Sequence, residues 1–129
     1  MEARAMNTSS DEAAVVAAAL DYFEGWFEGD ATRMERALHP GLAKRSLGQG
    51  DADPVEVRTL TKERMVELTA AGGGRDKSPD GGLRIDVEVV DLYGNVATAV
   101  VRSAVYREYL HLVRTDGGWK IVNVLWHFT

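Results

Sequence analysis

The chain has 129 residues, no cysteine and a formal net charge of −5. The length is that of one domain, and the lack of cysteine excludes disulfides, thiolate nucleophiles and cysteine-ligated metals. The acidic balance argues against a general nucleic-acid or anionic-membrane surface, so we expect neither kind of partner. No apolar run is long enough to span a bilayer and no signal peptide stands out, so a cytoplasmic protein is the default expectation.

The first 28 residues predict a tail followed by a long helix. Residues 1–8 are expected to be a disordered tail, which leaves residues 9–129 as a single domain. Ser9 or Ser10 can cap a helix that runs to about Glu28, and Ser9-x-x-Glu12 matches a capping box. Apolar residues recur along this segment at helical spacing in two adjacent stripes, so we expect the helix to be deeply packed.

Shorter elements are expected next. Asp30 can cap a second helix that runs through Leu38 and is stopped by Pro40 and Gly41. Residues 42–48 are expected to form a short strand and residues 48–54 a loop. Thr61 can cap a third helix, which should fray into the glycine-rich segment 72–82, expected to be a mobile surface loop.

The remaining chain predicts strands. Residues 83–89 alternate apolar and charged side chains, Gly94-Asn95 marks a hairpin turn, and residues 96–114 form one long β run. A turn at residues 116–118 leads to the last strand over residues 119–128. Segregated helices and strands indicate an α+β domain, with N-terminal helices packed in a strongly curved antiparallel or mixed sheet. Helices laid in such a curved sheet form a cone closed at one end, and we expect this cone to enclose a pocket for a small molecule.

The chain resembles the nuclear transport factor 2-like (NTF2-like, SnoaL-like) superfamily, and within it the bacterial subgroup of putative lumazine-binding proteins. The resemblance covers residues 12–127 and implies the NTF2-like cone, but this scaffold hosts enzymes, carriers and association modules. The segments that carry it are Tyr22-Phe23-Glu24-Gly25-Trp26, Gly29-Asp30, Ala37-Leu38-His39-Pro40, Leu42-Ala43-Lys44-Arg45, Leu60-Thr61, Met65-Val66, Tyr109-Leu110-His111-Leu112-Val113 and Gly118-Trp119-Lys120-Ile121-Val122-Asn123-Val124-Leu125-Trp126.

Ketosteroid isomerase, a member of this superfamily, suggests which positions carry chemistry. Its first-helix tyrosine corresponds to Tyr22, and the protonated aspartic acid of its oxyanion hole corresponds to His111. Its aspartate base corresponds to Ser46, and a serine has no basic form near neutral pH. The resemblance therefore implies Tyr22 and His111 as catalytic donors if the protein is an enzyme, with no base between them.

Further side chains are expected to line the cone. Tyr22 can equally be a core residue, His111 and Tyr109 share one face of their strand, which can meet the cone or solvent, and Lys44 can lie inward or at a solvated rim. His39 is expected to be a helix-end residue. The predicted ligand-binding set is Tyr22, Trp26, Lys44, Ser46, Met65, Tyr109, His111 and Trp126.

Three functional hypotheses remain open at this stage. The first is a binding protein for an aromatic or heterocyclic small molecule. The second, its alternative, is a cofactor-free isomerase, lyase or cyclase acting on an apolar carbonyl compound. The third is a protein-association domain, with Tyr106, Val124, Trp126 or their alternates on an open sheet face, which we expect to be covered in a homodimer. The three histidines lack paired-ligand spacing and no phosphate-binding loop opens a helix, so neither a metal nor a cofactor is expected.

Overall fold

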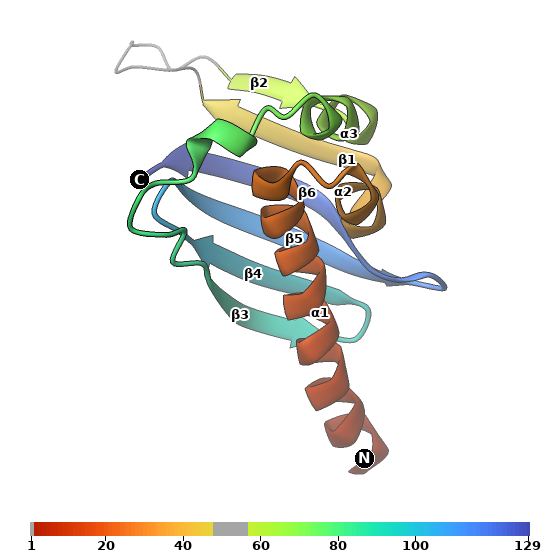
Figure 1. Cartoon of the computed structure of the whole chain (residues 1–129). Coiled ribbons are helices and arrows are strands. Elements are labelled where there is room, and N and C mark those ends of the chain that lie inside the picture. The colour runs from red at the N-terminus through yellow and green to blue at the C-terminus, as the bar shows by residue number, and fades with distance from the viewer. Residues whose placement is uncertain (1, 48–56) are drawn as a thin grey trace.

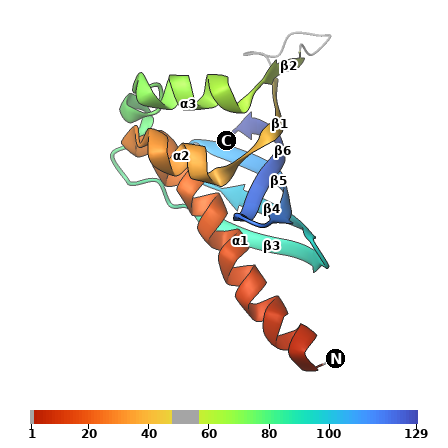
Figure 2. The same ribbon diagram turned by 90° about the vertical axis from the view of Figure 1, so that its right-hand side faces the viewer.

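Helices cover one face of a single curved sheet (Figures 1 and 2). The computed structural model describes residues 2–47 and 57–129, with side chains from residue 10 onward, so the loop expected at residues 48–54 lies outside the described residues. Three α-helices are described: α1 (Glu2–Glu28), α2 (Ala31–Ala37) and α3 (Lys62–Ala70), together with the short 3₁₀ helix η1 (Arg75–Lys77). The α+β cone expected from the sequence is therefore the observed architecture.

The sheet has six described strands in the order β2-β1-β6-β5-β4-β3. Every neighbouring pair is antiparallel except β1 and β6, which run parallel, so the sheet is mixed. The first and last described strands along the chain, β1 and β6, thus lie side by side within the sheet. The strands are β1 (Leu38–Leu47), β2 (Val57–Leu60), β3 (Asp86–Tyr93), β4 (Val96–Arg102), β5 (Tyr106–Thr115) and β6 (Gly118–Phe128).

Local sequence signals set several of these boundaries. Asp30 caps α2 by accepting a hydrogen bond from the Arg33 backbone N–H at 3.1 Å, and Thr61 caps α3 in the same way through Arg64 at 3.2 Å. Gly29, between the first two helices, has a φ of +71°, a conformation that glycine adopts without steric cost. The two predicted caps, Asp30 and Thr61, are confirmed.

The structure corrects the start of α1. The helix begins at Glu2, so residues 2–8 are helical and neither Ser9 nor Ser10 is its N-cap. A good N-capping sequence does not fix the start of a helix when the residues before it, here Ala3 to Met6, are mostly good helix formers themselves.

Two strand boundaries also differ from the prediction. The first strand begins at Leu38, before Pro40, and the short strand β2 pairs with it by the antiparallel contacts of residues 57–60. The run expected over residues 96–114 is divided into β4 and β5 by a turn at residues 103–105. Ser103 forms this turn, because its hydroxyl accepts the backbone N–H of Tyr106 at 3.0 Å. A turn without glycine or proline leaves little trace in the sequence.

Alternation along β5 decides what faces the helices. The side chains of Tyr106, Glu108, Leu110 and Leu112 are buried, whereas those of Arg107, Tyr109 and His111 are exposed. The buried set faces α1 and closes the core, so the even-numbered positions of β5 point into the cone. The exposed set lies on the outer face of the sheet.

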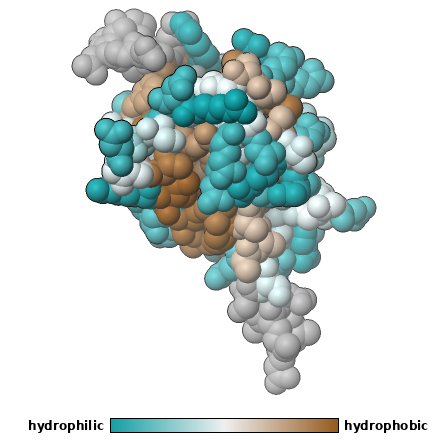
Figure 3. All heavy atoms as spheres, viewed as in Figure 1, coloured by the Kyte–Doolittle hydropathy of each residue, from teal (hydrophilic) through white to brown (hydrophobic). Residues whose placement is uncertain are grey.

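The core is continuous between the helices and the inner face of the sheet. Val15, Ala19 and Phe23 of α1 pack with Leu110 and Ile121 of the sheet, and all are 2% exposed or less. The view in Figure 3 shows mainly hydrophilic side chains with a hydrophobic strip alongside α1. No helix in the described part of the chain is long and apolar enough to cross a membrane.

Candidate functional site

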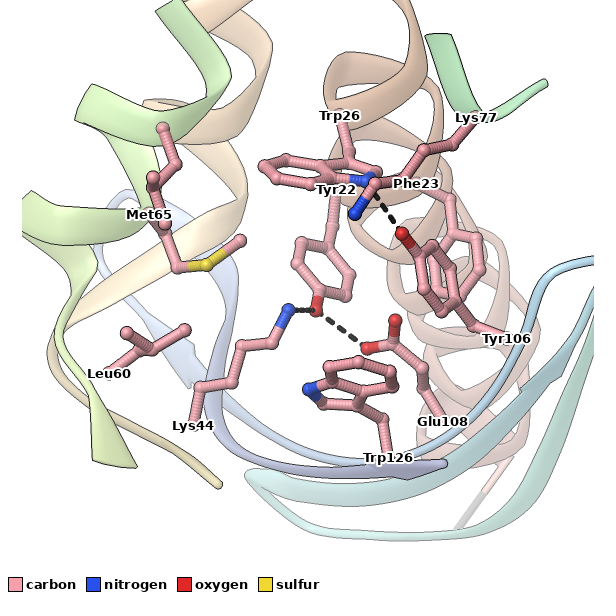
Figure 4. Close-up of a pocket in the computed structure, with 11 residues that line it drawn as sticks. Tyr22, Phe23, Trp26, Lys44, Leu60, Met65, Lys77, Tyr106, Glu108 and Trp126 are labelled. Atoms are coloured by element: carbon pink, nitrogen blue, oxygen red, sulfur yellow. Dashed lines mark hydrogen bonds between the residues drawn. The ribbon is translucent and has the colours of Figure 1, made fainter. Parts of the chain in front are cut away.

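A cavity of about 160 Å³ lies between the C-terminal half of α1, helix α3 and the inner face of the sheet (Figure 4). Most of its wall is aromatic or aliphatic, and its polar side chains are few. The lining residues are Tyr22, Phe23, Trp26, Lys44, Leu60, Met65, Leu68, Lys77, Tyr106, Glu108 and Trp126.

Strand pairing brings the polar residues of the sheet together. Lys44 of β1 pairs with Val124 of β6, which pairs with Leu110 of β5. Glu108 lies two residues before Leu110 and therefore on the same inner face, one pleat away from Lys44. Tyr22 comes down onto this pair from α1, at the level of the second-last helical turn.

The three side chains form one hydrogen-bonded chain (Figure 4). The Lys44 ammonium donates to the Tyr22 hydroxyl oxygen at 2.6 Å, and the Tyr22 hydroxyl donates to Glu108 Oε1 at 2.6 Å. Tyr22 is 2% exposed, Lys44 7% and Glu108 3%. A cation and a carboxylate are thus connected inside the cone through a phenol, in place of a direct ion pair.

Burial shifts the pKa of each member of the chain. Desolvation raises the pKa of Glu108 above its usual value, although the Lys44 charge and the Tyr22 hydrogen bond oppose the shift. Desolvation lowers the pKa of Lys44, against the attraction of Glu108. The pKa of Tyr22 is raised by burial and further by the Glu108 carboxylate. All three shifts favour the uncharged forms of the side chains.

Aromatic rings surround the ends of this chain. Lys44 Nζ lies 5.5 Å from the centre of the Trp126 ring, within the range of cation–π attraction. Trp26 Nε1 donates to the Tyr106 hydroxyl oxygen at 3.2 Å. The buried Nε1 of Trp126 has no hydrogen-bond partner among the described residues, so it is a donor available to a bound molecule.

A second cation lies at the helical side of the cavity. Lys77 of η1 places its ammonium 5.8 Å from the centre of the Trp26 ring. The segment that carries Lys77 lies close to α1, and this approach requires a glycine at position 74. A Cβ at Gly74 would lie 2.5 Å from the Trp26 carbonyl oxygen. The positive charge of Lys77 also contributes to the lowered pKa of Lys44.

The structure brings part of the predicted ligand-binding set together. Tyr22, Trp26, Lys44, Met65 and Trp126 line the cavity. Ser46 lies on the same face of β1 as Lys44, two residues further along, and is outside the lining. His39 belongs to β1 instead of a helix end, and its Nδ1 accepts the Gly41 backbone N–H at 2.9 Å.

His111 and Tyr109 lie outside the cavity although both belong to the predicted ligand-binding set, so of the two orientations left open the outward one is observed. Tyr109 is 48% exposed on the outer face, and His111 lies there too, in a shallow groove where the Asn123 side-chain amide is 3.3 Å from its Nδ1. The neighbouring Leu110 and Leu112 take the interior positions of the strand, and alternation forces the odd-numbered residues outward.

The same alternation explains why Tyr106, Val124 and Trp126 do not form an open patch. They face the cone, where Tyr106 is 5% and Val124 2% exposed. Their alternates Tyr109 and Leu125, paired on neighbouring strands, are the exposed apolar residues at this position of the sheet.

Glu108 was missed in the sequence although a signal for it exists. It is in phase with Tyr106, Leu110 and Leu112, and a carboxylate among apolar residues on one face of a strand is typical of a buried functional group. The signal is weak because Tyr109, His111 and Val113 make the opposite face look equally apolar. Among the side chains of residues 10–47 and 57–129, no three histidines, aspartates or glutamates gather as a metal site would require.

Solved structures with this fold define the class of the protein. The chain superposes on an NTF2-like protein of unknown function from Silicibacter pomeroyi with a TM-score of 0.71, at 16% identity over 95% of this chain and 98% of the other. An NTF2-like protein with a cystatin-like fold from Novosphingobium aromaticivorans gives 0.71 at 16% identity, covering 98% and 86%. The molecule therefore has the NTF2-like fold, as the resemblance implied.

Sequence comparison identifies the family within this class. The model of the family described as "Putative lumazine-binding" matches residues 10–127, so the chain belongs to that family. The chain is also similar to the aldolase FrzH from Cladobotryum sp., with 26% identity in an alignment that covers 93% of each protein.

The buried carboxyl makes stability depend on pH in a defined direction. Because the pKa of Glu108 is raised in the folded protein, its contribution to stability is full below the unfolded value and is lost as the pH rises through the folded value. Glu108→Gln resembles the protonated acid and cannot ionise. We expect the stability of the wild type relative to this variant to fall as the pH rises above about 4.5.

Urea unfolding of both proteins at a series of pH values measures this difference. Glu63→Gln, at an exposed position in the first turn of α3, serves as the control and should show no comparable trend. A constant difference between the wild type and Glu108→Gln across the same pH range would contradict the assignment of a buried, destabilised carboxylate.

Proposed function

We propose that the protein is a cofactor-independent enzyme that transfers a proton next to the carbonyl group of a small, mainly apolar compound, in an isomerase or lyase reaction. The observation that carries this proposal is the Lys44–Tyr22–Glu108 hydrogen-bonded chain on the wall of the aromatic cavity. Sequence reasoning lacked a base for such chemistry, and Glu108 supplies a carboxylate inside the cone.

Each member of the chain has a role that its chemistry suits. Lys44 and Tyr22 can donate hydrogen bonds to a carbonyl oxygen and stabilise the negative charge that develops there. Glu108 can accept the proton from the adjacent carbon, and a raised pKa brings a carboxylate closer to the range of an efficient base at neutral pH. Lys44 thus takes the place in the donor pair that the sequence assigned to His111.

The side chains that line the cavity suit a flat, largely apolar compound. Phe23, Trp26 and Trp126 offer ring surfaces, and Trp126 Nε1 offers one further hydrogen-bond donor. A heterocycle with carbonyl groups, as the name of the family suggests, has this shape. The similarity to an aldolase supports the lyase class in particular.

Hydrogen exchange at a carbon next to a carbonyl tests the proposal without knowledge of the natural substrate. Phenylacetone, 4-phenylbutan-2-one and cyclohexanone in D₂O are suitable probes. Their exchange is measured by the loss of the proton NMR signals of the carbons next to the carbonyl group. We expect the wild type to accelerate exchange of at least one ketone above buffer, and Glu108→Gln to lose about 10²-fold or more of that rate. Glu63→Gln should retain it.

The outcome separates catalysis from simple binding. If the ketones raise the melting temperature of the wild type but exchange no faster than in buffer, the cavity is a binding site without chemistry. That result would reject the proposed enzyme and favour a carrier of small aromatic molecules.

We also propose that a second copy of the chain covers the outer face of the sheet. Val100, Tyr109 and Leu125 are register neighbours on three adjacent strands, and Tyr109 and Leu125 are about half exposed, at 48% and 49%. A two-fold dimer places such a row against its own copy and removes it from water.

Sedimentation equilibrium tests this dimer. The wild type should sediment as a dimer at micromolar concentration, and Leu125→Asp should shift it to monomer because the charge would be buried in the interface. Val57→Asp, on the exposed edge strand β2 away from this row, is the control and should leave the dimer intact. A monomeric wild type would contradict the proposal.

A further inference from the structure

We infer that Lys44 is a nucleophile, and that it forms a Schiff base with carbonyl compounds after passing its proton through Tyr22 to Glu108. This inference deepens the proposed function, on which it rests, by changing Lys44 from a hydrogen-bond donor to a covalent catalyst. It also names the substrate class as a ketone or aldehyde, since only these form imines with an amine.

The placement of Lys44 suits a nucleophile. Its amine lies on the wall of the cavity, is almost fully removed from solvent, and lies beside the ring of Trp126. Its hydrogen bond among the described residues goes to the Tyr22 phenol instead of to a carboxylate. A lysine held permanently as an ion-pair partner would be expected to contact Glu108 directly, which is absent among the contacts that the structure describes.

The geometry of the chain allows the amine to lose its proton without leaving a charge behind. As Lys44 gives a proton to the Tyr22 oxygen, Tyr22 gives its own proton to Glu108 Oε1, and both hydrogen bonds are 2.6 Å long. The products are a neutral amine, an intact phenol and a carboxylic acid. Two charges in a low-dielectric site are exchanged for none, which burial favours.

The charged and titratable groups around the amine either disfavour or favour a positive charge on Lys44. Lys77, the other cation of the cavity, disfavours a positive charge on Lys44, whereas the Glu108 carboxylate favours it. Protonation of Glu108 through the relay removes this opposing interaction. Tyr106, which lies beside the chain and accepts a hydrogen bond from Trp26, is an uncharged phenol with a raised pKa.

The covalent step is balanced by these same groups. The Lys44 lone pair attacks the carbonyl carbon, the C=O π electrons move to oxygen, and a proton moves from nitrogen to that oxygen to give a carbinolamine. Glu108 then donates its proton to the hydroxyl group, the C–O bond breaks, and water leaves as the iminium ion forms. Glu108 is left as a carboxylate.

The carboxylate so formed can act in the next step. It can remove a proton from the carbon next to the iminium ion, which gives an enamine. With a β-hydroxy ketone it can instead take the hydroxyl proton while the bond between the α and β carbons breaks, which gives an aldehyde and the enamine. Protonation of the enamine and addition of the released water restore the free lysine and a ketone, so no other reactant is needed.

Reductive trapping tests the inference on the whole chain. Phenylacetone and sodium cyanoborohydride should add one ketone, less one water and plus two hydrogens, to the wild type, and peptide mapping should place it on Lys44. Lys44→Arg keeps the charge but should lose this addition, whereas Lys120→Arg, a substitution far from the cavity lining, should retain it. Addition at Lys77, or addition spread over surface lysines, would overturn the inference.

Tyr22→Phe tests the relay as distinct from packing. Without the phenol, labelling of Lys44 near neutral pH should slow about 10²-fold, the usual contribution of a positioned proton-transfer group. The loss should shrink at high pH, where hydroxide removes the proton directly. An equal loss at all pH values would indicate that Tyr22 only shapes the site and would overturn the relay.

Oxygen exchange distinguishes failure of this inference from failure of the proposed function. A Schiff base requires the carbonyl oxygen of the ketone to exchange with solvent, so the wild type should speed the incorporation of oxygen-18 from labelled water into phenylacetone. Deuterium exchange without oxygen exchange or trapping would overturn the Schiff base and leave proton transfer by Glu108 intact. Absence of deuterium exchange as well would reject both.

Discussion

The bridge that the Tyr22 hydroxyl makes between Lys44 and Glu108 is the interaction on which the interior of this cone depends. A buried ammonium and a buried carboxylate are each costly, and they persist in a fold only when their hydrogen-bonding needs are met. Here a single phenol meets both, and it connects helix α1 to strands β1 and β5 at one point. The site therefore exists only when the first helix is seated on the sheet, which couples its chemistry to the packing of the core.

Strong local signals in the sequence predicted most of the fold. Asp30 and Thr61 cap their helices because a side-chain oxygen can satisfy a free backbone N–H there, and residues 94–95 and 116–118 turn the chain as expected. The turn at residues 103–105 and the strand β2 were missed because serine and a four-residue strand carry little local information. The strand β2 forms by pairing with β1, and the turn is held by Ser103 and by backbone hydrogen bonds of residues 104 and 105 with residues 83 and 129, which local patterns do not record.

The lining of the cavity was predicted in part, and the errors on β5 have one cause. Tyr22, Trp26, Lys44, Met65 and Trp126 line the cavity, whereas His111 and Tyr109 lie outside it. A strand with apolar residues on both faces can be placed in either orientation, and a shift of one residue exchanges every inward and outward side chain. Because the wrong face of β5 was chosen, the prediction included Tyr109 and His111 and omitted Glu108. The scaffold is shared by many functions, so the role of the pocket must be argued from this constellation of side chains.

Energetic coupling between Lys44 and Glu108 is the most direct measure of the buried chain. A double-mutant cycle of Lys44→Met, Glu108→Gln and the combined variant, followed by urea unfolding at neutral pH, reports it. Each single substitution leaves a polar partner buried without its counterpart, whereas the combined variant leaves neither, so we expect a coupling energy of about 1–3 kcal/mol, with the combined variant no less stable than the weaker single one. Strictly additive losses would show that the two side chains do not meet through Tyr22 and would contradict the account.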